Sequence, residues 1–341
     1  MKAHILGLVI SALAGIAAAH PTYRLTILNP LEGYETCTVD AINDSGLIVG
    51  KSHRWVDGRE VSLATLWQDG KAISLGTLGG DWSRATGINR HGQVVGYSTL
   101  PPGYEDAWHS FWYRDGKDHL RDLTPYQMTT AASINDWGVA VGGLYDRDGN
   151  YVDVMVASRG VVTRLGVGPT GVVAINNDGA ILLRDCNEWC EARLFKQGAS
   201  YWLFFGLPFG LNNLGAVTGY ATVDNLSRAV LYADGKLQVL EMPLRYNLCH
   251  GHALNDQNEV VGHCNSRPIM WRNGKSFDLL DLVVDGGNAG LDSGEAKGVN
   301  RKGQIVGNGQ RGDMYVGFLL TPTRVATHPG DAASVPTSSG Q

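Results

Sequence analysis

Three histidines and two cysteines fall within one short stretch of the chain: Cys249, His250, His252, His263 and Cys264. If this stretch is a β-hairpin that turns over residues 255–258, opposite residues have numbers that sum to 513. Cys249 then faces Cys264, and His250 faces His263. Alternation along the strand places His252 on the same side. Three imidazoles on one face could bind Zn²⁺ or Cu²⁺, but hydrogen-bonded or solvated histidines would give the same pattern.

A second group of residues is rich in aromatic rings and arginine and is spread over segments that differ between repeats. We take as candidate ligand-binding residues Arg54, Trp55, Trp82, Arg84, Tyr104, Trp108, His109 and Tyr145. Such residues suit stacking on a sugar or a protein hot spot. The alternative is that individual rings pack beneath loops.

Motifs for other chemistries are missing. The chain has no G-x-S-x-G, H-E-x-x-H, phosphate-loop or dinucleotide fingerprint, and nothing singles out a catalytic carboxylate pair. Asp146, Asp148 and Asn150 alternate as in calcium loops, but an Asp-Gly hairpin tip explains them equally well. We therefore expect no cofactor. If a metal binds, it would be Ca²⁺ there or Zn²⁺ or Cu²⁺ on the three histidines.

The elements that position these residues repeat seven times. A hydrophobic residue, an Asn and a tight polar turn recur at 36- to 46-residue intervals, at Asn43, Asn89, Asn135, Asn176, Asn212, Asn255 and Asn300. Each unit adds a Gly-bounded strand and a later hairpin signal, such as WQDGK (67–71). Four short antiparallel strands per unit predict an all-β, seven-bladed β-propeller of four-stranded blades.

The two ends of the repeat array are complementary. The last unit stops after three strands, at VGFLLTP (316–322), and YRLTIL (23–28) precedes the first unit as an extra strand. Pairing the N-terminal strand with the last blade would close the ring and remove the sheet edges. An open solenoid is the all-β alternative, but it leaves this strand without a partner.

The units resemble HAF repeats of bacterial extracellular proteins. The segments that carry the resemblance are AINDSGLIVG (41–50), SFWYRDGK (110–117) and SLGTLGG (74–80). The resemblance covers most of residues 23–323. Two units depart from the pattern: the fourth lacks the second Gly, and the sixth has Leu254 and Asn258 at the Ile and first-Gly places. The resemblance implies an exported repeat protein and brings no catalytic residues.

The ends and the composition fit an exported domain. Residues 1–19 have the basic start, apolar stretch and A-x-A site of a signal peptide, residues 20–323 form one propeller domain, and residues 324–341 read as a disordered tail. The net charge of −5 does not indicate binding of nucleic acid, and no apolar segment is long enough to span a membrane. We expect a secreted or periplasmic monomer.

In an oxidising compartment, the five cysteines predict two disulfides. We expect Cys249–Cys264 from the hairpin register and Cys186–Cys190 as a small loop between strands. Cys37 would then be free and buried.

Function follows from where the loops lie. The Asn turns are alike and should share one face, which we call the Asn-turn face. Long, dissimilar loops should meet on the opposite face, where binding sites usually lie. We therefore expect a non-catalytic binding module for a glycan or protein partner. The alternatives are a polysaccharide lyase or glycoside hydrolase with its site at the channel mouth, which requires acidic or His residues to converge on the first strands, or a purely structural role.

Overall fold

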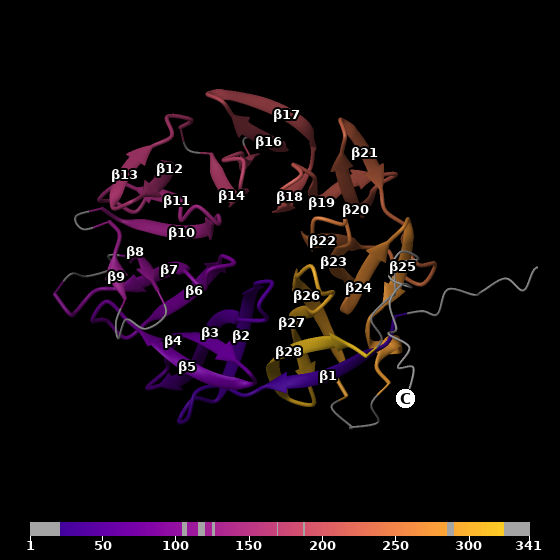
Figure 1. The fold of residues 1–341 in the computed structure, drawn as a ribbon, viewed down its shortest axis with the longest axis horizontal. Coiled ribbons are helices and arrows are strands. Elements are labelled where there is room, and N and C mark those ends of the chain that lie inside the picture. Colours follow the sequence, from indigo (N-terminus) through magenta and orange to yellow (C-terminus); the bar gives the residue numbers. More distant parts are fainter. Residues whose placement is uncertain are drawn as a thin grey trace, which may run out of the picture.

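A computed structural model describes residues 21–103, 108–114, 120–124, 127–168, 170–186, 188–284 and 290–323. These residues form seven four-stranded antiparallel sheets arranged as blades around an axis (Figure 1). The all-β, seven-bladed propeller is therefore confirmed. The expected signal peptide (1–19) and tail (324–341) lie outside the described residues. Within them, no helix is long and apolar enough to cross a membrane.

The blades are numbered in chain order, and each runs from the axis outward. Blade 1 is β2 (Thr36–Ile42), β3 (Ile48–Val56), β4 (Arg59–Gln68) and β5 (Lys71–Gly76). Blade 2 is β6 (Ser83–Ile88), β7 (Val94–Thr99), β8 (Trp108–Tyr113) and β9 (Arg121–Asp122). Blade 3 is β10 (Thr129–Ile134), β11 (Ala140–Tyr145), β12 (Tyr151–Ser158) and β13 (Val161–Arg164). Blade 4 is β14 (Gly171–Ile175), β15 (Ile181–Cys186), β16 (Cys190–Lys196) and β17 (Ala199–Phe205).

Blade 5 is β18 (Leu207–Leu211), β19 (Val217–Val223), β20 (Leu226–Ala233) and β21 (Lys236–Val239). Blade 6 is β22 (Cys249–Leu254), β23 (Val260–Cys264), β24 (Arg267–Arg272) and β25 (Lys275–Asp278), followed by the 3-10 turn η1 (Leu280–Leu282). Blade 7 is β26 (Ser293–Val299), β27 (Ile305–Arg311) and β28 (Met314–Pro322), with β1 (Tyr23–Leu28) outside them.

The ring closes as the sequence predicts. β1 pairs antiparallel with β28, from Tyr23 opposite Pro322 to Leu28 opposite Gly317. The N-terminal strand thus supplies the fourth strand of blade 7, and the open-solenoid alternative is excluded.

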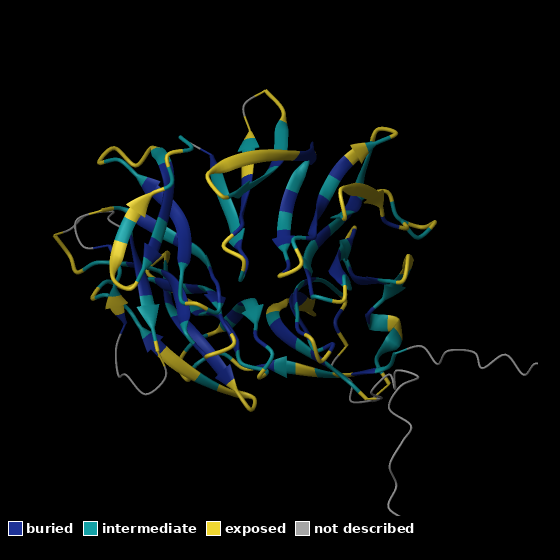
Figure 2. Ribbon diagram, turned by 45° about the horizontal axis from the view of Figure 1, so that its top comes forward, coloured by how far each residue is buried: buried dark blue, intermediate teal, exposed yellow. Residues whose placement is uncertain are grey.

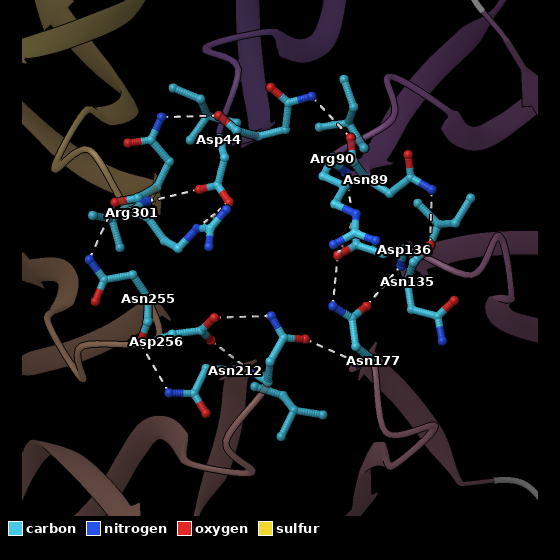
Figure 3. A pocket seen from close by; sticks show the side chains of 18 of the residues that line it. Asp44, Asn89, Arg90, Asn135, Asp136, Asn177, Asn212, Asn255, Asp256 and Arg301 are labelled. Atoms are coloured by element: carbon cyan, nitrogen blue, oxygen red, sulfur yellow. Dashed lines mark hydrogen bonds and ion pairs between the residues drawn. The ribbon is translucent and has the colours of Figure 1, made fainter.

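The seven motif asparagines build a hydrogen-bonded ring. In each turn the side-chain oxygen accepts the backbone N–H groups two and four residues later, as Asn135 does from Trp137 and Val139 at 3.1 and 3.0 Å. The side-chain N–H of each Asn also donates to the carbonyl of the next motif Asn, at 3.0–3.3 Å around the whole ring, part of which Figure 3 shows. The last of these bonds joins Asn300 to Asn43, so the side chains that shape the turns also tie consecutive blades together.

The glycine of the turn is needed for its backbone conformation. It has positive φ in six blades, for example 92° at Gly46, and in blade 6 Asn258 takes the same conformation at 58°. Asn tolerates this region better than other residues with a side chain, which explains the departure of the sixth unit from the repeat pattern.

A β-bulge recurs in the innermost strand of every blade, three residues before the motif Asn. The second Gly of the motif lies on the neighbouring strand where the bulge brings the backbones close. A Cβ on Gly262 would lie 1.9 Å from the carbonyl oxygen of His250. The motif therefore encodes both a turn and a bulge, and bulges redirect side chains.

The core lies between neighbouring blades. Figure 2 shows buried residues concentrated along the strands, and exposed ones at the turns and outer strands. Two fully buried tryptophans, Trp67 and Trp271, occupy equivalent third strands, and each indole N–H donates to a backbone carbonyl, at Asn29 and Glu241, both at 2.7 Å. Apolar burial with the polar ring atom satisfied is what stabilises such large side chains.

Four of the long loops expected on the face opposite the Asn turns are tight turns, whereas connections from strand four to the next blade, such as residues 77–82 and 240–248, are loops as expected. Strands two and three are joined by two-residue turns in blades 1, 5, 6 and 7, over residues 57–58, 224–225, 265–266 and 312–313. For these four connections the expectation was wrong because the strands extend further than their apolar pattern suggested. In blade 1, Asp57 and Gly58 both have positive φ, the hairpin signal used elsewhere in the chain but missed here.

Both disulfides form as predicted, Cys186–Cys190 and Cys249–Cys264, and Cys37 is free and buried. The register that places Cys249 opposite Cys264 and His250 opposite His263 is also correct. The predicted register holds for the pairs before the bulge at His252. Between the bulge and the turn, the pairing is shifted by one residue. Alternation alone did not predict that bulge.

Candidate functional site

Three positions per blade carry the side chains around the ring axis on the face opposite the Asn turns. We call them the mouth positions: five and three residues before the motif Asn, and eight residues after it. The first and third are cross-strand partners, and the second is the bulge. In blades 6, 7, 1 and 2 they are His250, His252 and His263; Glu295, Lys297 and Asn308; Thr38, Asp40 and Lys51; and Arg84, Thr86 and Tyr97.

Blades 3, 4 and 5 carry fewer reactive groups at these positions. They are Thr130, Ala132 and Gly143; Gly171, Val173 and Arg184; and Leu207, Phe209 and Tyr220. Acidic groups and imidazoles thus gather on one side of the ring, in blades 6, 7 and 1.

The three histidines of blade 6 form one cluster. The ring centroids of His250 and His252 lie 5.0 and 4.9 Å from that of His263. Tyr220 of blade 5 stacks on His250 at 4.0 Å, and Phe209 meets His252 edge-on at 5.4 Å. The alternation argument correctly placed all three on one face.

Burial keeps these imidazoles neutral. It lowers the pKa of His250 to about 4 and that of His252 to about 2, and it also lowers the pKa of His263, where the carboxylate of Glu295 opposes the effect. An uncharged imidazole can accept a proton or bind a metal ion. At neutral pH the cluster therefore offers nitrogen lone pairs rather than positive charge.

A polar pocket of about 190 Å³ opens beside the cluster, between blades 6 and 7. Its walls carry mainly hydroxyl, amide and acid groups, from His263, Asn265, Ser266, Ser293, Glu295, Asn308, Gln310 and Tyr315, together with two glycines. Glu295 forms an ion pair with Lys297 at 2.9 Å and lies 3.9 and 4.0 Å from Nδ1 of His252 and His263. The pocket can therefore hold a hydroxyl-rich group against a carboxylate and an imidazole.

A second charged pair lies on the neighbouring blades. The guanidinium of Arg84 binds both carboxylate oxygens of Asp40, with its Nε at 2.9 Å. This partner raises the pKa of Arg84 despite burial. Burial raises the pKa of Tyr315, and the carboxylates of Glu295 and Asp40 raise it further.

Three of the candidate residues from the sequence do come together. Trp82 and Trp108 meet edge-on at 4.7 Å, and Tyr97, which the sequence reasoning missed, stacks on Trp82 at 5.4 Å. Arg84 adjoins them through a hydrogen bond to Tyr97. This aromatic cluster borders the charged side of the mouth.

Three of the other candidates, Arg54, Trp55 and His109, are not part of this site. Arg54 lies over the ring of Tyr34 at 5.2 Å, and Trp55 is 60 % exposed on β3. His109 is buried and bonds Asp122 at 2.7 Å.

Tyr145 contacts Tyr151 edge-on at 5.3 Å and its hydroxyl lies 3.3 Å from Thr130, and Tyr104 is outside the described residues. Placing these residues on loops was wrong, because Arg54, Trp55, Arg84, Trp108, His109 and Tyr145 are all strand residues.

The missed residues had a usable signal. Asp40, Glu295 and Lys297 lie at the same offsets from the motif Asn as His250 and His252. Comparing the seven units position by position would have grouped them, but only if the bulge were known.

The Asn-turn face also has a cavity, of about 180 Å³ around the axis, but its polar groups bond to one another (Figure 3). Arg301 binds Asp44 at 2.6 Å, and Asn177 donates to Asp136 at 2.7 Å. We interpret this face as architectural.

The possible calcium loop is a hairpin turn. One carboxylate oxygen of Asp146 accepts the backbone N–H groups of Asp148 and Asn150, both at 2.9 Å. The alternating polar residues are thus explained by turn geometry.

Comparison with known proteins adds the fold but no family. No protein-family model and no curated protein matches the chain. Among solved structures, a puromycin-hydrolyzing peptidase of Mycobacterium tuberculosis is 12% identical with a TM-score of 0.60, over 89% of this chain and 55% of that one. The acylaminoacyl peptidase of Pyrococcus horikoshii is 8% identical with a TM-score of 0.52, over 86% and 52%. The chain thus spans about half the length of these peptidases.

The propeller domain of the trilobed protease of Pyrococcus furiosus is similar over nearly its whole length, with 8% identity, a TM-score of 0.53 and coverage of 87% and 98%. At these identities the likeness shows the fold alone. The similar propellers are parts of peptidases, so the comparisons do not support our expectation of a non-catalytic binding module.

Proposed function

We propose that the protein is a propeller enzyme that cleaves polysaccharide chains, as a lyase or a glycoside hydrolase, at the mouth opposite the Asn turns. One observation carries the proposal. Asp40, His250, His252 and Glu295 all lie on the innermost strands of adjacent blades, and Glu295, in the wall of the polar pocket, lies 3.9 Å from Nδ1 of His252. This is the arrangement that the sequence analysis required of an enzyme.

The lining of the mouth suits a sugar substrate. Hydroxyl and amide groups of Ser266, Ser293 and Gln310 can bond sugar hydroxyls in the pocket. Glu295 is our choice for proton transfer, because it is the carboxylate in the pocket wall.

Elimination fits the charges better than hydrolysis. A glycoside hydrolase needs one carboxyl group in the protonated form, whereas Asp40 and Glu295 are each paired with a cation, Arg84 and Lys297. In elimination, the Glu295 carboxylate would take the C–H proton next to the carboxyl group of an acidic sugar. A C=C bond then forms while the glycosidic C–O bond breaks, and water protonates the leaving oxygen.

Similarity to the propellers of peptidases does not imply peptidase chemistry in this chain. Ser227 and His250 are hydrogen-bonded at 2.9 Å, but among the described residues no carboxylate bonds that histidine, so a Ser-His-acid triad is incomplete. Polysaccharides therefore remain the substrate class that we propose.

The test is incubation with a panel of acidic and neutral polysaccharides, followed by assays for new reducing ends and for the ultraviolet absorbance of unsaturated products. We expect unsaturated products from an acidic polysaccharide. The Glu295→Gln variant should lose about 10²-fold or more in rate, as removal of a proton-transfer group does, while Glu188→Gln, an exposed control, should not. If no polysaccharide is cleaved, or if Glu295→Gln is fully active, the proposal is wrong.

We also infer that the protein is exported through its N-terminal leader and is related to HAF-repeat proteins. The two disulfides support an oxidising compartment. Expression in a bacterium with a mass measurement of the periplasmic and secreted chain tests this, because cleavage near Ala19 is expected and an intact leader would contradict it.

A further inference from the structure

The three mouth positions of blade 6 are all histidine, and they lie close enough to share one ligand. One nitrogen from each of His250, His252 and His263 falls in a group whose members are all within 4.8 Å of one another. In a tetrahedral zinc site with Zn–N bonds of 2.0–2.1 Å, nitrogens are roughly 3.3 Å apart. The rings must therefore close by up to about 1.5 Å, which rotation about the side-chain bonds provides.

Each histidine has a nitrogen available for this. Nδ1 of His252 lies 3.1 Å from the carbonyl oxygen of Ala296 and must donate to it, which leaves Nε2 as the lone-pair nitrogen. Nε2 of His250 bonds Ser227 at 2.9 Å and leaves Nδ1. A second-sphere carbonyl that fixes one tautomer is typical of metal-binding histidines.

His263 supplies an independent observation. Its Nδ1 is buried and has no hydrogen-bond partner, although buried polar groups are almost always satisfied. A bound cation removes this anomaly in either ring orientation. The nitrogen then binds the ion itself or, with Nε2 bound, points its hydrogen toward Glu295, whose Oε2 is 4.0 Å away and must move closer to accept it.

The surrounding structure limits how far the three rings can move apart. The Cys249–Cys264 disulfide joins the two strands directly beside His250 and His263. Tyr220 stacks on His250, and Phe209 meets His252 edge-on. Ligands fixed in this way lose little freedom when they bind an ion.

The local charge permits a divalent cation. Burial holds the imidazoles in the neutral form that binds metals. The positive charge of Lys297 is offset by its ion pair with Glu295, whose carboxylate also faces two of the histidines.

We propose that His250, His252 and His263 form a binding site for one Zn²⁺ ion, with three protein ligands and a fourth position open to water. Imidazole nitrogens suit Zn²⁺, and three-ligand sites of this type keep an open coordination position. This metal site is a proposal separate from polysaccharide cleavage and does not depend on it. It also departs from our expectation of no cofactor, which rested on missing motifs and on hydrogen-bonded or solvated histidines as the simpler account.

The experiment is calorimetric titration of Zn²⁺ into the full-length protein after treatment with a chelator, together with absorption spectroscopy of the Co²⁺ form. We expect one ion per chain and the intense visible bands of four- or five-coordinate Co²⁺. The His252→Ala and His263→Ala variants should bind at least 100-fold more weakly. His91→Ala, which removes an exposed imidazole of the Asn-turn face, should bind like the wild type.

Circular dichroism checks that the variants fold, and the wild-type titration is decisive even if they do not. The proposal is overturned if the wild type binds Zn²⁺ no more tightly than the folded His252→Ala variant does. A weak, octahedral Co²⁺ spectrum of the wild type would also overturn it. Glu295→Gln separates the two proposals, because it should weaken Zn²⁺ binding by only about 10- to 100-fold while abolishing polysaccharide cleavage. Zn²⁺ binding without any cleavage would leave the metal site standing and refute only the enzyme.

Discussion

The ring of motif asparagines predicts a specific loss of stability when one member is removed. Asn135 is 4% exposed and makes three hydrogen bonds to backbone groups: it accepts from Trp137 and Val139 and donates to the carbonyl of Asn176. At about 0.5–1.5 kcal/mol net for each bond, Asn135→Ala should lower the free energy of unfolding by roughly 2–4 kcal/mol. Asn135→Asp keeps both acceptor interactions and loses only the bond to the next blade, so it should cost about 1–2 kcal/mol.

Urea unfolding followed by tryptophan fluorescence measures both losses. Asn150→Ala is a matched control, because its side chain makes one exposed bond to Asp146 at 3.1 Å and should cost below about 0.5 kcal/mol. If Asn135→Ala costs no more than this control, the ring does not stabilise the fold. If Asn135→Asp costs as much as Asn135→Ala, the inter-blade bond outweighs the turn.

Two further predictions concern the cysteines. Burial raises the pKa of the Cys37 thiol from 9.0 to about 11. As pH rises, the unfolded chain therefore loses this proton before the folded chain does. The free energy of unfolding should fall by roughly 2–3 kcal/mol between about pH 9 and 11. Urea titrations across this range should show a shallower decline in Cys37→Ala, and an equal decline would contradict the assignment. The disulfides close loops with separations of 15 and 4 residues, so replacing Cys249 and Cys264 by Ala should cost roughly 3 kcal/mol, against roughly 2 for the Cys186–Cys190 pair. If both replacements lower the free energy of unfolding equally, or if the short loop loses more, then loop entropy is not the main source of stabilisation by these disulfides.

The ring could be predicted from the sequence because its determinants are local. The Asn turn and the Asp-Gly hairpins specify backbone conformations by residue type, and they recur often enough to number the blades. The extra strand at residues 23–28 then identified the closure. Bond partners between blades were not predictable, because the donor role of each Asn depends on the next turn in space.

The site was only partly predictable, for a physical reason. The aromatic candidates were chosen because they were expected on loops, but strand ends such as that at Trp55 extend past the apolar pattern. The residues that do converge are set by a bulge, and a bulge changes side-chain direction without altering hydrophobic alternation. The histidines were found only because their cross-strand register happened to be unaffected.

The closure of blade 7 has a consequence for the order in which the molecule can form. Thr22 and Thr323 are hydrogen-bonded although 301 residues separate them, and β1 is made first while its partner β28 is made last. Until synthesis is nearly complete, YRLTIL remains an apolar strand with an unpaired edge, a surface prone to association with other chains. The contact that completes the ring therefore also makes the nascent protein dependent on protection from aggregation.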